Sequence, residues 1–218
     1  MSTSEAVVPA PSPRAGSVLD LVPVLPVVTA ATVADGVAAA RALAAGGLPV
    51  VELTLRTPAA LEVIRAIASE VPEVVVGAGT IIGPRQAELA ARAGAQFLVS
   101  PGTTRPLLQA MRDTGLPFLP GVATVSEVLA ALDAGCSELK LFPAEASGGA
   151  AFLRSIAAPV PAARFCPTGG VTPANAAAYL SLPNVGCVGG SWLTPADAMA
   201  AQDWGRISRL AAEAAALR

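Results

Sequence analysis

Val50-Val51-Glu52-Leu53-Thr54-Leu55 is an apolar run of strand length, and the helical pattern Pro58–Glu70 and a second run, Val74–Gly79, follow it. Short runs of β-branched and aliphatic residues bounded by Gly or Pro are typical of strands, whereas apolar residues spaced three and four apart are typical of helices. A strand, a helix and another strand in this order form a β-α-β unit with parallel strands. This stretch therefore predicts such a unit.

The same unit recurs along the chain. Each short apolar run ends in Gly, Pro, Ser or Thr, an alanine-rich segment with helical spacing follows, and strand starts lie roughly 20 to 27 residues apart, close to the minimum for a β-α unit. The eight predicted strands are Val24–Val28, Val50–Leu55, Val74–Gly79, Phe97–Pro101, Pro117–Val122, Glu138–Pro143, Arg164–Gly169 and Val185–Gly189. The predicted helices are Ala31–Ala45, Pro58–Glu70, Pro84–Ala93, Arg105–Thr114, Thr124–Ala134, Gly149–Ile156, Pro173–Leu180 and Ala196–Leu217.

Eight such units predict an α/β fold of the (β/α)8 TIM barrel type, with residues 17–218 forming a single domain. Residues 1–16 are rich in Ser, Pro and Ala and are expected to be a mobile tail. An open doubly wound sheet is the alternative. No GxGxxG follows the first strand, and Gly77-Ala78-Gly79-Thr80 is interpreted as a tight turn at a strand end, so the barrel is favoured.

Composition argues against nucleic acid and membranes as partners. Hydrophobic residues make up 53% of the 218 residues and charged residues only 14%, which suits a large buried core. The net charge is −2 without a basic cluster, and aromatic residues are 4%, so nucleic acid is not expected as a partner. No apolar run reaches transmembrane length and no signal peptide is recognisable, so no membrane partner is expected.

The cysteines and the absence of histidine argue against a metal site. Cys136, Cys166 and Cys187 are odd in number and widely spaced, which favours reduced thiols and a cytoplasmic protein. Without histidine they form no recognisable zinc pattern. We expect neither a metal nor a cofactor.

Lys140 is the only lysine, whereas the other 13 basic residues are arginines. Arginine replaces lysine wherever a solvated charge is enough, but not where an amine must lose its proton and attack a carbonyl. Lys140 also lies in the apolar run Leu139–Pro143. Burial disfavours a charged amine, and the neutral amine is the nucleophile, so Lys140 is a candidate for Schiff-base chemistry. A lysine that snorkels from a strand edge is the structural alternative.

Side-chain parity directs several polar residues toward one axis. Glu52, Thr54 and Arg56 share one face of their strand, and Lys140 shares the inner face of its own with Glu138 and Phe142. The second and sixth barrel strands lie opposite each other, so Glu52 and Lys140 can meet across the mouth. The alternative is a buried ion network of Lys140 with Glu52 or Glu138, although such pairs are rarely worth keeping for stability alone.

Paired glycines end the last two predicted strands. They occur in Thr168-Gly169-Gly170 and in Gly189-Gly190-Ser191. Barrels often bind phosphate at this corner through backbone N–H groups, and glycines let the backbone approach the phosphate oxygens closely. The Ser191 hydroxyl adds a donor, so this corner is predicted to bind phosphate.

Six motifs occur in order: Glu52-Leu53-Thr54-Leu55-Arg56-Thr57, Gly77-Ala78-Gly79-Thr80, Ser100-Pro101-Gly102, Leu141-Phe142-Pro143-Ala144-Glu145, Phe165-Cys166-Pro167-Thr168-Gly169-Gly170 and Gly189-Gly190-Ser191-Trp192. With them, the chain from about Val24 to its C-terminus resembles the 2-keto-3-deoxy-6-phosphogluconate aldolase family. The resemblance implies a homotrimeric (β/α)8 barrel of the Entner–Doudoroff pathway, a class I aldolase that forms a Schiff base with a phosphorylated 2-keto acid and often also acts on 4-hydroxy-2-oxoglutarate.

The resemblance also implies the role of each site residue. Lys140 forms the Schiff base, and Glu52 moves protons during carbinolamine formation and C–C cleavage. The substrate-binding residues, from the carboxylate end to the phosphate end, are Arg56, Thr80, Pro101, Phe142, Thr168, Gly169, Gly170, Gly189, Gly190 and Ser191. Among these, Arg56 and Thr80 bind the pyruvate carboxylate, while Gly169, Gly170 and Ser191 bind the phosphate.

One stretch departs from the family pattern. Many relatives carry a basic residue just after the first strand, where this chain reads Val28-Thr29-Ala30-Ala31-Thr32. Two alternative functions stay open: an aldolase for another substrate, such as the 6-phosphogalactonate epimer, and a catalytically silent barrel that serves as an assembly subunit.

Overall fold

The computed structural model describes residues 16–217, so the predicted tail lies outside the described residues except for Gly16. Parallel strands alternate with helices throughout. In chain order the elements are η1 (Val18–Asp20), β1 (Val24–Val28), α1 (Val33–Ala45), β2 (Val50–Thr54), α2 (Ala60–Glu70), β3 (Val75–Gly79), α3 (Pro84–Arg92), β4 (Leu98–Val99), α4 (Arg105–Asp113), β5 (Phe118–Leu119), β6 (Gly121–Val122), α5 (Val125–Asp133), β7 (Glu138–Leu141), η2 (Glu145–Ser147), α6 (Gly149–Ile156), β8 (Arg164–Pro167), α7 (Pro173–Leu180), β9 (Val188–Gly190), α8 (Ala196–Ala200) and α9 (Trp204–Ala215).

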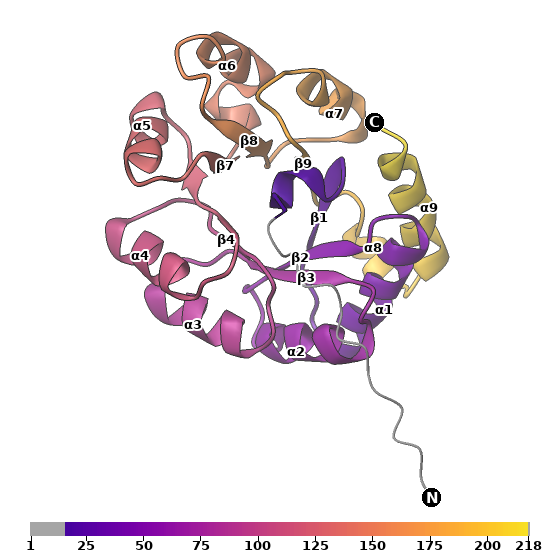
Figure 1. Cartoon of the computed structure of the whole chain (residues 1–218). Coiled ribbons are helices and arrows are strands. Elements are labelled where there is room, and N and C mark those ends of the chain that lie inside the picture. Colours follow the sequence, from indigo (N-terminus) through magenta and orange to yellow (C-terminus); the bar gives the residue numbers. More distant parts are fainter. Residues whose placement is uncertain (1–15, 218) are drawn as a thin grey trace, which may run out of the picture.

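The strands form two parallel sheets, and the helices lie outside them (Figure 1). The larger sheet has the order β5-β4-β3-β2-β1-β9, and the smaller one has the order β6-β7-β8. Pro120 alone separates β5 from β6, and its carbonyl accepts a bond from the Lys140 N–H at 3.0 Å. At the other edge, single parallel bridges join Phe165 to Val185 and Thr168 to Gly189. Each edge of one sheet therefore lies beside an edge of the other.

Two predicted elements are divided in the structure. The predicted strand Pro117–Val122 is interrupted at Pro120, which has no N–H for the strand ladder. The prediction of one closing helix over Ala196–Leu217 is wrong, because the helix breaks between α8 and α9. Gln202 takes a positive φ of 54° at the break, and Asp203 then caps α9 by accepting the Arg206 N–H at 2.9 Å.

Local signals explain most helix boundaries. Thr32, Thr104 and Thr124 each cap a helix by accepting a backbone N–H at its start, and Thr124 forms a full capping box with Glu127. At the other ends, several helices are followed by a glycine with positive φ, for example 99° at Gly94. These caps let short alanine-rich helices end where the next strand must begin.

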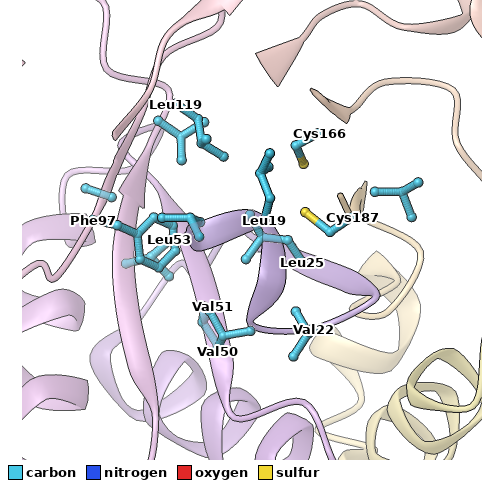
Figure 2. Packing of buried hydrophobic residues seen from close by; sticks show 14 of the residues in the cluster. Leu19, Val22, Leu25, Val50, Val51, Leu53, Phe97, Leu119, Cys166 and Cys187 are labelled. Atoms are coloured by element: carbon cyan, nitrogen blue, oxygen red, sulfur yellow. The ribbon is translucent and has the colours of Figure 1, made fainter. Parts of the chain in front are cut away.

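The core lies between the strands and the helix layer, and it also includes η1, which sequence patterns did not predict. Figure 2 shows Leu19 of η1 among core residues such as Leu25 and Leu53. Gly186 accommodates this segment, since a Cβ there would lie 2.5 Å from the Leu19 Cβ. Arg164 at the start of β8 fixes η1 through an ion pair with Asp20 at 2.6 Å. The η1 segment thus packs into the end of the molecule where β8 begins.

Within residues 16–217, no helix combines the length and the apolar character that crossing a membrane requires.

Candidate active site

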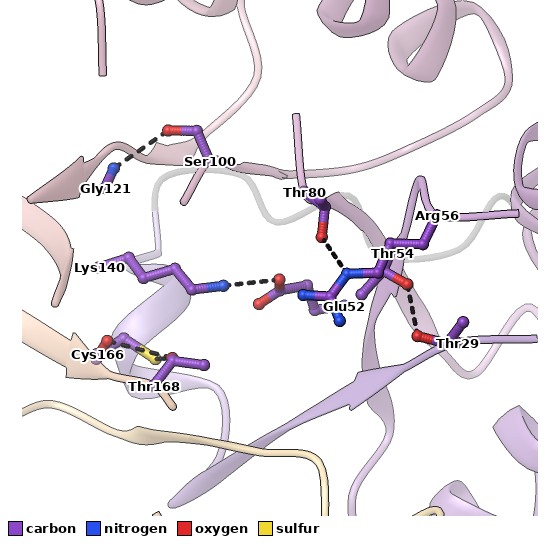
Figure 3. Close-up of polar contacts among 10 residues, drawn as sticks. All are labelled: Thr29, Glu52, Thr54, Arg56, Thr80, Ser100, Gly121, Lys140, Cys166 and Thr168. Carbon is purple, nitrogen blue, oxygen red and sulfur yellow. Dashed lines mark hydrogen bonds and ion pairs between the residues drawn. The ribbon is translucent and has the colours of Figure 1, made fainter. Parts of the chain in front are cut away.

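Glu52 on β2 and Lys140 on β7 form a buried ion pair. Their strands belong to different sheets, yet the Lys140 Nζ donates to the Glu52 Oε1 at 2.9 Å (Figure 3). The exposed fractions are 0% for Glu52 and 4% for Lys140. Side chains on alternating positions of parallel strands point to one side, so parity brings both inward as predicted. Burying two charges costs several kcal/mol of desolvation per ion, which makes stability alone a poor reason for the pair.

One carboxylate oxygen of Glu52 is unpaired. Its Oε2 is buried and has no hydrogen-bond partner among the described residues, whereas buried polar atoms in proteins are nearly always bonded. Gly79 on the adjacent β3 leaves the space for this carboxylate, because a Cβ there would lie 2.2 Å from the Glu52 Oε1. A carboxylate that holds an amine through one oxygen and leaves the other free can accept a proton from a ligand or a water.

Arg56 and Thr80 lie together just beyond the ends of β2 and β3. The Arg56 Nε donates to the Thr80 Oγ1 at 3.2 Å (Figure 3). Thr80 takes a φ of 59°, a left-handed conformation that costs a non-glycine residue energy and is found most often at functional sites. The rest of the Arg56 guanidinium keeps N–H donors for a carboxylate, the group that its planar fork matches.

Phe142 connects Lys140 with the first glycine pair. The Lys140 Nζ lies 5.5 Å from the centroid of the Phe142 ring, within the range of a cation–π contact. The edge of the same ring lies against Gly169, where a Cβ would come within 3.2 Å of it. Phe142 therefore contacts both the buried amine and the glycine turn.

Thr168 lies between the two glycine pairs. It is buried, and a parallel bridge joins it to Gly189. A Cβ at Gly189 would lie 2.1 Å from the Thr168 Oγ1, so glycine at this position makes room for the threonine. On β8, Cys166 pairs in register with Lys140, and its Sγ lies 3.7 Å from the Thr168 Oγ1 (Figure 3). Thr168 is thus placed on the same inner face as the lysine.

The Gly169–Gly170 turn presents free backbone donors. Both residues have positive φ, 95° and 80°. The N–H groups of Gly170 and Val171 donate to no protein acceptor within residues 16–217. Successive unpaired N–H groups in a turn form a concave site that binds anions. Such a turn can accept an anion, and the prediction that it binds phosphate stays a prediction.

Ser191, after β9, lines a pocket of about 420 Å³. Thr29, just after β1, and Asp35 on α1 also line it, and Asp35 is the only charged residue among the lining residues. The Thr29 hydroxyl shares a 2.7 Å hydrogen bond with Thr54, two residues beyond Glu52 (Figure 3). The Thr32 and Gln202 side chains bond the Asp35 carboxylate and lower its pKa, so it is ionised at neutral pH.

Gly190 and Pro101 serve as backbone spacers. A Cβ at Gly190 would lie 2.7 Å from the Trp192 ring, so glycine lets the chain turn toward Ser191. Pro101 follows β4, and its backbone lies against Gly121, where a Cβ would come within 2.3 Å of the Pro101 carbonyl carbon. Pro101 therefore lies at the same strand ends as the site without a contact to the ion pair.

Three features of the site were not predicted. Ser100 is buried and accepts the Gly121 N–H at 3.1 Å, and Thr29 bonds Thr54. Both hydroxyls have partners from other strands, which periodicity along one strand does not reveal. Glu138 pairs with Arg164 at 3.3 Å rather than with Lys140, so the alternative of a network through Glu138 is wrong. Within the described residues, no group of three or more Cys, Asp or Glu side chains is arranged to hold a metal ion.

Known proteins share this fold and sequence. Residues 16–210 match the family model described as aldolase, KDPG and KHG aldolase. The KHG/KDPG aldolase of Escherichia coli K12 is 52% identical over 200 residues, which cover 92% of this chain and 94% of the relative. A KDPG aldolase structure from Legionella pneumophila, with pyruvate captured as a covalent carbinolamine intermediate, is 42% identical with a TM-score of 0.89, covering 91% of this chain and 96% of that one. The Zymomonas mobilis ZM4 enzyme, solved with 3-phosphoglycerate, is 46% identical with a TM-score of 0.87, covering 92% and 94%.

Proposed function

Since this chain belongs to the KDPG and KHG aldolase family, we propose that it cleaves 2-dehydro-3-deoxy-6-phosphogluconate into pyruvate and glyceraldehyde 3-phosphate through a Schiff base on Lys140. The buried Lys140–Glu52 ion pair is the observation that carries this proposal. It places the only lysine of the chain beside a carboxylate with one unpaired oxygen, and both groups are buried. An amine and a proton acceptor are what imine formation requires.

The first stage joins the substrate to Lys140. The neutral amine attacks the C2 carbonyl to give a carbinolamine, and Glu52 protonates the departing hydroxyl, directly or through water, so that a protonated imine remains. Arg56 and Thr80 bind the substrate carboxylate, which orients C2 toward the amine. Phe142 excludes water beside the amine.

The second stage breaks the C3–C4 bond. Glu52 accepts the proton of the C4 hydroxyl, the C4–O bond becomes a carbonyl, and the electron pair of C3–C4 flows into the imine to leave an enamine. Glyceraldehyde 3-phosphate leaves, C3 is protonated, and water hydrolyses the imine to release pyruvate. The electron pair of the broken bond neutralises the iminium cation, so no free carbanion forms. This sequence of steps therefore needs no metal.

The glycine turn binds the phosphate at the far end of the substrate. We propose that the N–H groups of Gly169 and Gly170 and the Ser191 hydroxyl donate to it, with Gly189 and Gly190 providing the space and Thr168 close to the substrate hydroxyls. The N–H groups of Gly170 and Val171, which donate to no acceptor among the described residues, support this assignment. The same residues suit a phosphorylated 2-keto acid better than a short neutral one.

The two sheets are proposed to form one closed (β/α)8 barrel. Pro120 links β5 to β6 directly, and the bridges beside β8 and β9 link the remaining edges. Barrel closure would place Glu52 and Lys140 on facing walls at the carboxyl ends of the strands, where barrel enzymes have their active sites.

The homotrimer is likewise a proposal. Val125 and Leu129 are 39% and 49% exposed and lie one turn apart on α5, which gives an apolar strip suited to a second copy of the chain. Sedimentation of the purified protein measures the assembly, and a Leu129→Glu variant that still sediments as the native species would exclude this strip as the contact. A cytoplasmic location remains a prediction, in keeping with a phosphorylated sugar-acid substrate.

The site also suits 4-hydroxy-2-oxoglutarate. That substrate needs only the groups at the keto end, namely Lys140, Glu52 and Arg56, because it has no phosphate. Because the glycine turn is assigned to the phosphate, its loss should leave that reaction unchanged. The 6-phosphogalactonate epimer differs at C4 alone, and turnover of the two epimers side by side decides between them.

Borohydride trapping tests the central proposal. Reduction in the presence of pyruvate should attach one pyruvate remnant, and peptide mapping should place it on Lys140. The N-terminal amine is the only other primary amine in the chain, so the assignment is unambiguous. An unmodified Lys140 would refute the Schiff-base mechanism and favour the catalytically silent barrel.

A further inference from the structure

Both carbonyls of the Gly169–Gly170 turn accept hydrogen bonds from other parts of the protein. The Glu145 N–H donates to the Gly169 carbonyl at 3.1 Å, and the Asn175 Nδ2 donates to the Gly170 carbonyl at 3.1 Å. Asn175 is itself fixed by the Thr172 N–H at 2.7 Å. An anion site made of backbone groups works only if the turn keeps this orientation, because glycine has no side chain that holds it.

The Glu145 side chain packs against the turn. A Cβ at Gly170 would lie 2.5 Å from the Glu145 Cγ, and one at Gly149 would lie 3.3 Å from the Glu145 Oε1. Glycine at both positions thus makes room for this side chain. Both its backbone and its side chain contact the turn. The ion-pair partner of Lys140 is Glu52, not Glu145.

Tyr179 on α7 determines where Glu145 lies. Its hydroxyl donates to the Glu145 Oε1, and the residue is 1% exposed. Burial, together with the hydrogen bond and charge of Glu145, raises the pKa of Tyr179, so the hydroxyl keeps the proton that it donates. A buried hydroxyl and a carboxylate joined in this way fix each other's rotamers.

We propose that Tyr179 and Glu145 are positioning residues for phosphate binding: Tyr179 holds the Glu145 side chain against Gly170, and Glu145 keeps the glycine turn in its anion-binding conformation. Neither residue touches the phosphate. The inference rests on the proposed function, because it takes the turn to be the site of the substrate's phosphate.

Tyr179→Phe tests the proposal, because it removes only the hydroxyl. We expect the KM for the phosphorylated substrate and the dissociation constant of inorganic phosphate to rise about tenfold, a loss typical of one hydrogen bond to a charged group. The KM for 4-hydroxy-2-oxoglutarate should change less than twofold. Glu145→Ala should reproduce the loss, whereas Glu145→Gln, which keeps the stem and an acceptor oxygen, should restore most of the affinity.

Ile67→Val is the control for a general loss of stability. Ile67 is buried on α2, and it has no part in the turn. If this variant melts as early as Tyr179→Phe but binds phosphate normally, lowered stability does not explain the effect. Equal phosphate affinity of Tyr179→Phe and the parent protein, or equal losses on both substrates, would overturn the inference. Failure of the proposed function is seen separately, as failure of the parent protein to trap pyruvate with borohydride.

Discussion

The proposed reaction centre and the proposed phosphate corner are built from different parts of the chain. Glu52 and Lys140 are side chains that two strands hold in the interior, and they contact each other at 2.9 Å. The turn at Gly169 and Gly170 offers backbone groups instead of side chains, and it lies in a loop near the surface. Phe142 contacts both regions.

The difference predicts which measurements each region controls. The reaction centre makes bonds with the substrate in every step, so its variants should lose turnover on all substrates. The phosphate corner binds a remote group, so its variants should affect phosphorylated substrates selectively, in kcat as well as KM where remote binding energy is used in the transition state. Four variants test this division, starting with the largest expected effect.

Lys140→Arg should lower kcat by roughly 10⁴–10⁶-fold on every substrate, a loss typical of removing a nucleophile. Guanidinium keeps the positive charge beside Glu52 but cannot lose a proton and attack a carbonyl. Steady-state kinetics measure the loss, and a melting curve close to that of the parent protein shows that the buried charge is still paired. Substantial activity in this variant would contradict the Schiff-base mechanism.

Glu52→Gln should lower turnover by about 10²–10⁴-fold, the usual contribution of a general acid–base group. The amide fills the same space beneath Gly79 but shuttles no protons. The loss should be similar for phosphorylated and unphosphorylated substrates. A variant that unfolds more easily but turns over normally per folded molecule would assign Glu52 to a structural ion network instead.

Ser191→Ala should weaken use of the phosphorylated substrate by about tenfold, as expected for one lost hydrogen bond to a charged group. Cleavage of 4-hydroxy-2-oxoglutarate should change little, since that substrate has no phosphate. The comparison of kcat/KM on the two substrates is the measurement. Equal losses on both would place Ser191 at the reaction centre and remove the division between the regions.

Asp35→Asn should improve kcat/KM for the phosphorylated substrate by about two- to threefold at low salt. Asp35 is the only charged residue that lines the pocket with Ser191. Its carboxylate should repel a bound phosphate weakly through the water between them. The gain should disappear at 1 M salt, where the Debye length is about 3 Å. The matched control is Glu73→Gln, which removes one exposed charge before β3, at the opposite ends of the strands. A gain in both variants would assign the effect to net charge alone.

Much of the reaction centre was predictable because it depends on strand parity. Alternation along Val50–Thr54 and Glu138–Leu141 is enough to direct Glu52 and Lys140 to one side, and the structure joins them. The phosphate corner was predictable only as paired glycines. Its carbonyl bonds from Glu145 and Asn175 depend on which segments lie side by side.

The sequence by itself determined the order of strands and helices, because apolar spacing, threonine caps and terminal glycines act within a few residues of the chain. It also determined which side chains face inward on each strand, and it singled out Lys140. Only the tertiary structure decided where Pro120 interrupts a strand, how η1 enters the core, and that Glu138 pairs with Arg164. It alone decided that Tyr179 reaches Glu145 beneath the glycine turn. These contacts join residues far apart in sequence, so their energies depend on packing between elements, which no local pattern encodes.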